Sequence, residues 1–186
     1  MLTNSSIAYG SVAKLLHWLI AILIVCMLIF GYFLGDVPKE YQPITYNIHK
    51  LTGLTILILM VFRLWWALMN VKPALPFDTL SWQRLAERVV HWSLYAIIIA
   101  MPIAGWIGSS AADRPPHVGK TKLLLPVEQS ESLMEASFNV HNTLALIIIA
   151  LVSIHVLAAL YHHVIKKDNV LRRMLPHRRD RQPFTS

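Results

Sequence analysis

Four long apolar segments restrict this chain to a membrane-spanning fold. Uninterrupted hydrophobic runs occur near residues 15–34, 51–69, 89–109 and 140–165. A helix of about 20 apolar residues, rising about 1.5 Å per residue, crosses a hydrocarbon core of roughly 30 Å. With 55% hydrophobic and only 15% charged residues, the chain is too apolar for an ordinary soluble domain. We therefore expect a single all-α domain over residues 1–186, an integral membrane four-helix bundle.

The distribution of lysine and arginine predicts how the bundle is oriented. One side of the membrane collects Lys14, Arg63, Lys72, Arg84, Arg88 and the basic tail 166–186. The opposite side has fewer cations, and these are Lys39, Lys50, Arg114, Lys120 and Lys122. Both termini are therefore expected in the cytoplasm. The formal charge of +7 comes chiefly from the tail, which fits contact with anionic lipid rather than with nucleic acid.

Three small or rigid residues interrupt the third apolar segment. Pro102, Gly105 and Gly108 predict either a kink that gives room to a neighbour or a cofactor, or close helix packing. The link that follows, residues 110–138, is the longest in the chain and is expected to cap the outer face of the bundle.

Four histidines near the ends of the apolar segments are the candidate functional residues. His141 and His155 are fourteen residues apart, which places them within roughly 40° on one helix face and about 21 Å apart along its axis. By depth, His49 is level with His141 on the outer side, and His17 is closer to His155 on the inner side. A histidine in lipid is costly without a partner. We therefore expect an outer pair, His49 with His141, and an inner pair, His17 with His155.

A fifth histidine leaves the inner pair open. The segment Leu15-Leu16-His17-Trp18 resembles Val89-Val90-His91-Trp92 in the third apolar run. His91 is therefore a second candidate at the depth of His17. The residues alone do not decide between them.

Haem iron fits these pairs better than zinc does. Structural zinc generally takes four ligands, often thiolates, and the single cysteine, Cys26, lies elsewhere. An iron porphyrin supplies four nitrogens, so two histidines complete its coordination and suit it to electron transfer. Because no Cys-x-x-Cys-His motif occurs, we predict two non-covalent haems of b type. The alternative for any single histidine is a packing or interfacial role.

Arg63 and His162 extend the candidate sites toward the cytoplasm. Arg63 follows His49 by fourteen residues and returns to the same face about 21 Å inward, where it could pair with a haem propionate or snorkel to the surface. His162 follows His155 by seven residues, within about 20° of its face and roughly 10 Å nearer the cytoplasm. That position suits proton exchange with a quinone head group, or an interfacial histidine facing lipid headgroups.

Several sequence segments resemble the bacterial cytochrome b561 family over nearly the whole chain. The segments are residues 14–18 (Lys-Leu-Leu-His-Trp), 47–54 (Asn-Ile-His-Lys-Leu-Thr-Gly-Leu), 140–141 (Val-His), 155–163 (His-Val-Leu-Ala-Ala-Leu-Tyr-His-His) and 167–176 (Lys-Asp-Asn-Val-Leu-Arg-Arg-Met-Leu-Pro). The resemblance implies a four-helix cytochrome of the bacterial inner membrane with two b haems. Its ligand pattern falls on His17 with His155 and on His49 with His141, which favours His17 over His91.

The resemblance also suggests an activity. One branch of the family is implied to oxidise superoxide at the outer face and to pass the electrons to ubiquinone near the cytoplasm, with His162 at the quinone site. In the outer link Arg114, Lys120 and Lys122 could attract an anion, although acidic residues follow them, namely Glu128, Glu131 and Glu135.

Three functions remain distinguishable. We expect a superoxide:ubiquinone oxidoreductase, that is, a superoxide oxidase of the respiratory chain. The alternative is an electron-conducting membrane anchor for a periplasmic dehydrogenase, hydrogenase or cytochrome. A histidine-lined metal transporter is a third possibility, which a coloured, haem-containing protein would exclude.

Overall fold

The computed structural model describes residues 1–74 and 79–175, so the expected basic tail beyond residue 175 lies outside the described residues. The described part is mostly helical, and each of its four long helices is long and apolar enough to cross a membrane. They are α1 (Ser11–Tyr32), α2 (Gln42–Met69), α3 (Ser81–Ala111) and α4 (Glu131–Tyr161). This confirms the all-α membrane bundle expected from the apolar runs.

The helices extend beyond the apolar runs that predict them. α2 begins at Gln42 rather than near residue 51, and α4 begins at Glu131 rather than near residue 140. The physical reason is that hydropathy marks only the part of a helix that lies in lipid, whereas backbone hydrogen bonding continues to the next cap. Ser130 caps α4, its side chain accepting a hydrogen bond from the Leu133 N–H.

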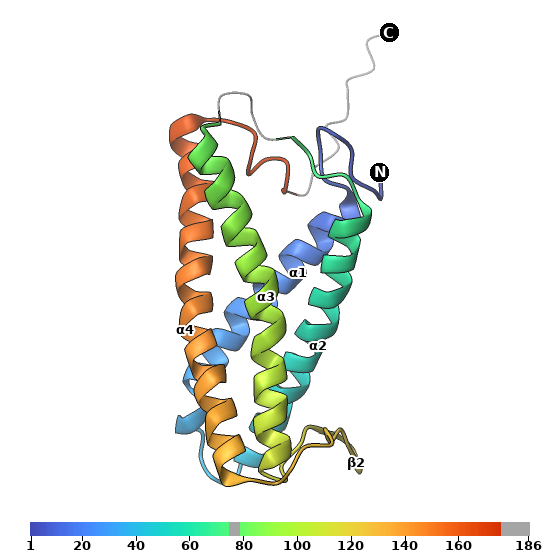
Figure 1. The fold of residues 1–186 in the computed structure, drawn as a ribbon, viewed down its shortest axis with the longest axis vertical. Coiled ribbons are helices and arrows are strands. Elements are labelled where there is room, and N and C mark those ends of the chain that lie inside the picture. Colours follow the sequence, from blue (N-terminus) through green and yellow to red (C-terminus); the bar gives the residue numbers. More distant parts are fainter. Residues whose placement is uncertain (75–78, 176–186) are drawn as a thin grey trace.

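The helices pack in sequence order around a branched aliphatic core. α3 packs against both α2 and α4, and α1 packs against α2 and passes behind α3 (Figure 1). Each helix contributes to the core, which contains Ile20, Ile24, Ile56, Met60, Ile98 and Ile148. Many apolar side chains point outward instead, such as Ile58 and Leu146, which are 69% and 70% exposed. An apolar exterior of this kind suits hydrocarbon rather than water.

The C-terminal segment folds back over the end of the bundle that carries the N-terminus. After α4, residues His162–Lys166 form a π-helical turn, and Lys167 adopts the left-handed region at φ 54°. The chain then crosses to α1 (Figure 1), where the Met174 carbonyl accepts a hydrogen bond from Trp18 Nε1 at 2.9 Å. The Leu175 carbonyl accepts one from Lys14 Nζ at 3.1 Å. We call this end of the bundle the terminal end.

A small hairpin covers the opposite end, which we call the hairpin end. It pairs β1 (His117–Val118) with β2 (Thr121–Lys122), and Gly119 turns the chain at φ 58°. The Asn47 side chain holds the hairpin to α2, donating to the His117 carbonyl and accepting from the His117 N–H, each at 2.9 Å. Lys50 Nζ donates to the Arg114 carbonyl at 2.6 Å. The long link is thus fixed over α2.

Ile148→Ala tests whether the core carries the stability of the bundle. Ile148 is 2% exposed, so removing its side chain should leave a cavity and lower the free energy of unfolding by about 2–4 kcal/mol. Thermal unfolding in detergent, followed by circular dichroism, measures the change. Ile154→Ala is the matched control because this side chain is 53% exposed on the same helix; equal losses in the two variants would contradict the core described above.

Candidate functional site

The fold brings the four histidines together as two pairs. His49 of α2 faces His141 of α4 with ring centroids 6.2 Å apart and an interplanar angle of 66°. His17 of α1 faces His155 of α4 with ring centroids 6.1 Å apart and an angle of 68°. The outer pair thus lies toward the hairpin end and the inner pair toward the terminal end, in the combinations expected from depth.

The spacing within each pair suits a metal ion between two imidazoles. A metal–nitrogen bond of about 2 Å on each side places the two ring centres roughly 6 Å apart. Within residues 1–74 and 79–175, no group of three or more His, Cys, Asp or Glu side chains could hold a metal ion. A metal between these pairs would therefore need further ligands, and the four nitrogens of a porphyrin provide them.

Two glycines make room for the rings of the outer pair. A Cβ added at Gly105 would lie 2.9 Å from His141 Nδ1, and one added at Gly31 would lie 3.2 Å from His49 Cε1. Any larger residue at Gly105 would push the His141 ring aside. Gly108 has a different neighbour, because its Cβ would lie 3.1 Å from the Phe138 ring. Of the two explanations that the sequence left open, Gly105 therefore gives room to His141, whereas Gly108 allows packing.

Hydrogen bonding prepares His141 to coordinate a metal. Its Nδ1 lies 2.9 Å from the Met101 carbonyl oxygen, and because a carbonyl only accepts, Nδ1 carries the proton. Nε2 then keeps its lone pair, as metal-binding histidines require. His49 Nδ1 is buried and has no hydrogen-bond partner among the described residues. Buried polar atoms are nearly always satisfied, so such an exception is typical of a site that binds a ligand.

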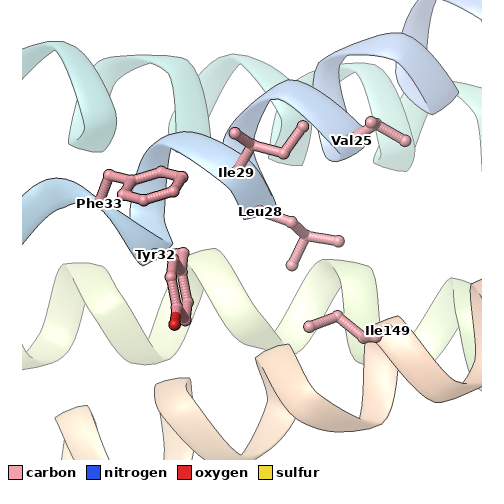
Figure 2. A pocket seen from close by; sticks show the side chains of 6 residues that line it. All are labelled: Val25, Leu28, Ile29, Tyr32, Phe33 and Ile149. Carbon is pink, nitrogen blue, oxygen red and sulfur yellow. The ribbon is translucent and has the colours of Figure 1, made fainter.

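An apolar cavity of about 340 Å³ opens between α1 and α4. Five of its lining residues come from the hairpin-end half of α1 and its C-terminus, and one comes from the middle of α4 (Figure 2): Val25, Leu28, Ile29, Tyr32, Phe33 and Ile149. Gly31, which contacts His49, lies within this stretch of α1. The cavity therefore adjoins the outer pair and offers apolar walls to a hydrophobic group such as a porphyrin.

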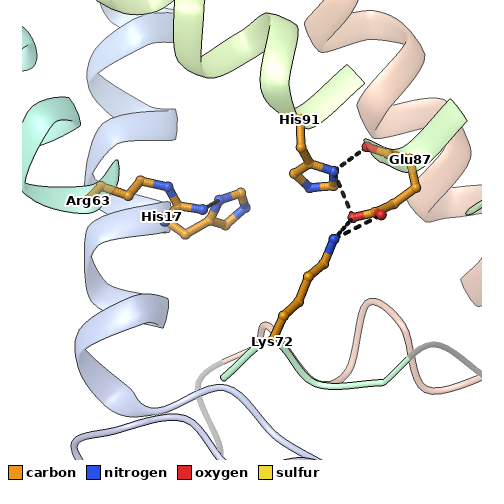
Figure 3. Close-up of polar contacts among 5 residues, drawn as sticks. All are labelled: His17, Arg63, Lys72, Glu87 and His91. Carbon is orange, nitrogen blue, oxygen red and sulfur yellow. Dashed lines mark hydrogen bonds and ion pairs between the residues drawn. The ribbon is translucent and has the colours of Figure 1, made fainter. Parts of the chain in front are cut away.

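Arg63 lies at the inner pair rather than at the membrane surface. Its guanidinium donates to the Ala13 carbonyl oxygen at 3.2 Å, and it contacts His17 Nδ1 at 3.2 Å (Figure 3). The structure thus does not place this side chain in the snorkelling position. A guanidinium beside His17 is suitably placed to pair with a haem propionate, which stays a prediction.

His91 also reaches the inner pair, but with a different geometry. Its ring centroid lies only 5.1 Å from that of His155, with an interplanar angle of 87°. This separation is too short for two imidazoles on opposite sides of one metal, for which roughly 6 Å is needed. The distances therefore favour His17 as the partner of His155, the choice that the residues alone left open.

His91 has polar partners that sequence reasoning missed. Its Nδ1 donates to the Glu87 carbonyl oxygen at 2.7 Å and lies 3.0 Å from Glu87 Oε1. Lys72 Nζ in turn donates to the two Glu87 carboxylate oxygens at 2.7 and 2.9 Å (Figure 3). The i,i+4 spacing of Glu87 and His91 is the sequence signal for this contact.

His162 is held by an acidic residue near the terminal end of α4. Its Nδ1 lies 2.5 Å from Asp168 Oδ2, and the other Asp168 oxygen accepts a hydrogen bond from the Val170 N–H at 2.9 Å. Burial alone would raise the pKa of Asp168, but these hydrogen bonds outweigh it and lower the pKa. The His162 side chain is only 17% exposed, so it is not a freely solvated interfacial histidine, and its Nε2 is the nitrogen left to meet a ligand.

Comparisons with known proteins agree with this arrangement. The model of the prokaryotic cytochrome b561 family matches residues 8–177. Cytochrome b561 homolog 2 of Escherichia coli K12 is 31% identical over 180 residues, which cover 93% of this chain and 94% of that protein. The probable superoxide oxidase CybB of Yersinia pestis is 32% identical over 166 residues, 88% of this chain and 93% of that protein. Cytochrome b561 homolog 1 of E. coli K12 is 30% identical over 175 residues, 88% of this chain and 94% of that protein.

Gly105→Ala tests the room that His141 needs. The added methyl would meet His141 Nδ1 at 2.9 Å, so the ring should move and the outer site should lose its haem, while the inner site keeps its own. The pyridine haemochrome assay measures haem per chain. Gly35→Ala is the control, since a Cβ there meets nothing within 4 Å. Full haem content in Gly105→Ala would show that the close contact is unimportant.

Proposed function

This chain belongs to the prokaryotic cytochrome b561 family, and we propose that it is a di-haem cytochrome that carries electrons across the inner membrane to quinone. The family binds haem b and transfers electrons in membranes. The observation that carries the proposal is the presence of two histidine pairs with the same ring separation, 6.1 and 6.2 Å, at two depths of one bundle.

In this proposal His49 and His141 hold one haem b, and His17 and His155 hold the other. Each bound haem supplies an iron that accepts and releases one electron reversibly. The chain supplies the remaining requirements. Two imidazoles per iron leave no open position for a substrate, the Met101 carbonyl fixes the His141 proton on Nδ1, and apolar side chains keep water away. These features suit electron transfer rather than chemistry on a bound substrate.

Superoxide is the donor that we favour. A relative named a probable superoxide oxidase is 32% identical over most of the chain, and the link at the hairpin end exposes Arg114, Lys120 and Lys122. Positive side chains attract a small anion and raise its local concentration. Lys122 also pairs with Asp113 at 3.6 Å, so part of this charge is neutralised. Oxidation of two superoxide anions yields two dioxygen molecules and two electrons.

Ubiquinone is the proposed acceptor at the terminal end. Its reduction consumes those two electrons and two protons, so the site must deliver protons from the cytoplasmic side. His162 suits this task, because Asp168 fixes the Nδ1 proton at 2.5 Å and leaves Nε2 to face the quinone oxygen. Arg63 would neutralise a propionate of the inner haem.

A second function follows from the acidic residues near the same link. Glu128, Glu131 and Glu135 are all exposed close to the cations. Such a mixed-charge surface suits the docking of a protein partner. The chain would then be the electron-conducting anchor of a periplasmic dehydrogenase, hydrogenase or cytochrome, with the same two haems and a different donor.

Single histidine variants test the ligand pairs. His49→Ala or His141→Ala should lose only the outer haem, and His17→Ala or His155→Ala only the inner, so each variant should retain one haem per chain. His91→Ala is the matched control and should retain both. Haem content and redox titration of the purified variants measure this. Loss of the inner haem in His91→Ala, together with its retention in His17→Ala, would reverse the inner assignment.

Stopped-flow mixing with superoxide tests the donor. Rapid reduction of the haems, followed by oxidation on addition of a soluble ubiquinone, is expected of a superoxide oxidase. Arg114→Gln and Lys120→Gln together should slow the reduction and weaken its dependence on salt. Haems that stay oxidised with superoxide, yet are reduced by dithionite and reoxidised by quinone, would exclude the oxidase and favour the anchor function.

A further inference from the structure

Three residues at the terminal end form a chain that ends at the inner pair, and the electron-transfer proposal does not use them. Lys72 precedes α3, while Glu87 and His91 lie one helical turn apart on it. Hydrogen bonds connect Lys72 to the Glu87 carboxylate and that carboxylate to His91 (Figure 3). The His91 ring then meets the ring of His155 edge-on, at 5.1 Å between centroids. His91 is too close to His155 to be its partner across a metal, so it requires another role.

The hydrogen bonds of His91 fix which of its nitrogens faces the inner pair. Nδ1 donates toward both the backbone carbonyl and the carboxylate of Glu87, at 2.7 and 3.0 Å. The neutral ring therefore carries its proton on Nδ1, and Nε2 is an acceptor. A histidine that coordinates iron through Nε2 keeps a proton on Nδ1 and donates it to a neighbouring acceptor, which makes the ligand more basic. The edge-on contact brings such an acceptor to His155.

The inner pair therefore lies between two opposite charges. The Arg63 guanidinium contacts His17 at 3.2 Å, and the Glu87 carboxylate lies behind His91 on the side of His155. A positive charge favours the reduced form of a nearby iron, and a negative charge disfavours it. The Glu87 side chain is only 23% exposed, so water screens its charge incompletely. His141 of the outer pair differs, because it donates to the neutral Met101 carbonyl.

We propose that Glu87, acting through His91, is a positioning residue that orients His155 and lowers the electron affinity of the inner haem, with Lys72 moderating the effect. The inference rests on the proposed binding of haem between His17 and His155. It assigns a purpose to the polar chain that neither ligation nor quinone binding requires. His91 and Glu87 touch no reacting atom in it.

Two single variants should shift the inner haem in opposite directions. Glu87→Gln removes the negative charge and should raise the midpoint potential of the inner haem. Lys72→Met leaves the carboxylate uncompensated and should lower it. Each should change the ratio of reduced to oxidised inner haem at a fixed potential by about three- to tenfold, the size expected for a unit charge roughly 10 Å away behind partial screening. Spectroelectrochemical titration measures both haems, and the outer haem is the internal control.

A merely structural role would not produce this pattern. Damage to the fold would move both variants in the same direction, or would move both haems. If the inner potential shifts in the same direction in both variants, or stays unchanged, the proposal is wrong. Lys72 is 56% exposed, so Lys72→Met should fold normally and keep the test valid even if Glu87→Gln does not accumulate.

A third variant tests the path through His91. His91→Phe keeps a ring of similar shape but lacks an acceptor nitrogen, so adding Glu87→Gln to it should no longer shift the inner potential. It should also change the electron paramagnetic resonance g-values of the inner haem alone, because His155 loses the group that orients it. An undiminished effect of Glu87→Gln in this background would show that His91 is not required.

Counting haems in the unmodified protein separates the two proposals. One haem or none per chain would overturn the di-haem function itself. Two haems with an inner potential that ignores residues 72 and 87 would overturn only the tuning by Glu87.

Discussion

The cost of an unpaired imidazole in hydrocarbon is the constraint on which this bundle depends. His141 and His155 lie on one rigid helix, so their fourteen-residue separation fixes both the face and the spacing of the two sites. Each of the other ligand-bearing helices, α1 and α2, then has one histidine to deliver at a set depth. Gly105 follows from the same constraint, because α3 can lie close to α4 only where it leaves room for His141.

Much of this arrangement could be predicted from the sequence because it depends on spacing along single helices. The apolar runs predict four helices, and the helical repeat predicts which histidines share a depth. The helix ends were predicted less well, because α2 and α4 continue through polar residues as far as their caps. The choice between His17 and His91 needed the distances to His155, 6.1 and 5.1 Å, which depend on how three helices pack. The contact between Lys72 and Glu87 depends on the path of the link before α3, so no local pattern predicts it.

The two histidine pairs have the same ring geometry but different surroundings. Around the outer pair lie a neutral carbonyl, two glycines and an apolar cavity, under a hairpin held by Asn47. Around the inner pair lie Arg63, Glu87 and Lys72, and His162 with Asp168 lies just beyond it. The ligand sets alone would make the sites equivalent. The charged residues give the bundle a chemical direction from the hairpin end to the terminal end.

The position of α4 in the chain has a consequence for biogenesis. This last helix supplies one histidine to each pair, and residues 174 and 175, which follow it, bind back to Trp18 and Lys14 beside His17. While the chain is being synthesised, α1, α2 and α3 can enter the membrane with no complete site among them. A ribosome that stops early therefore releases a polypeptide unable to retain haem at either depth. Acquisition of the cofactor then reports that translation has reached the end of the bundle, which gives the cell a simple mark by which to distinguish finished molecules from fragments.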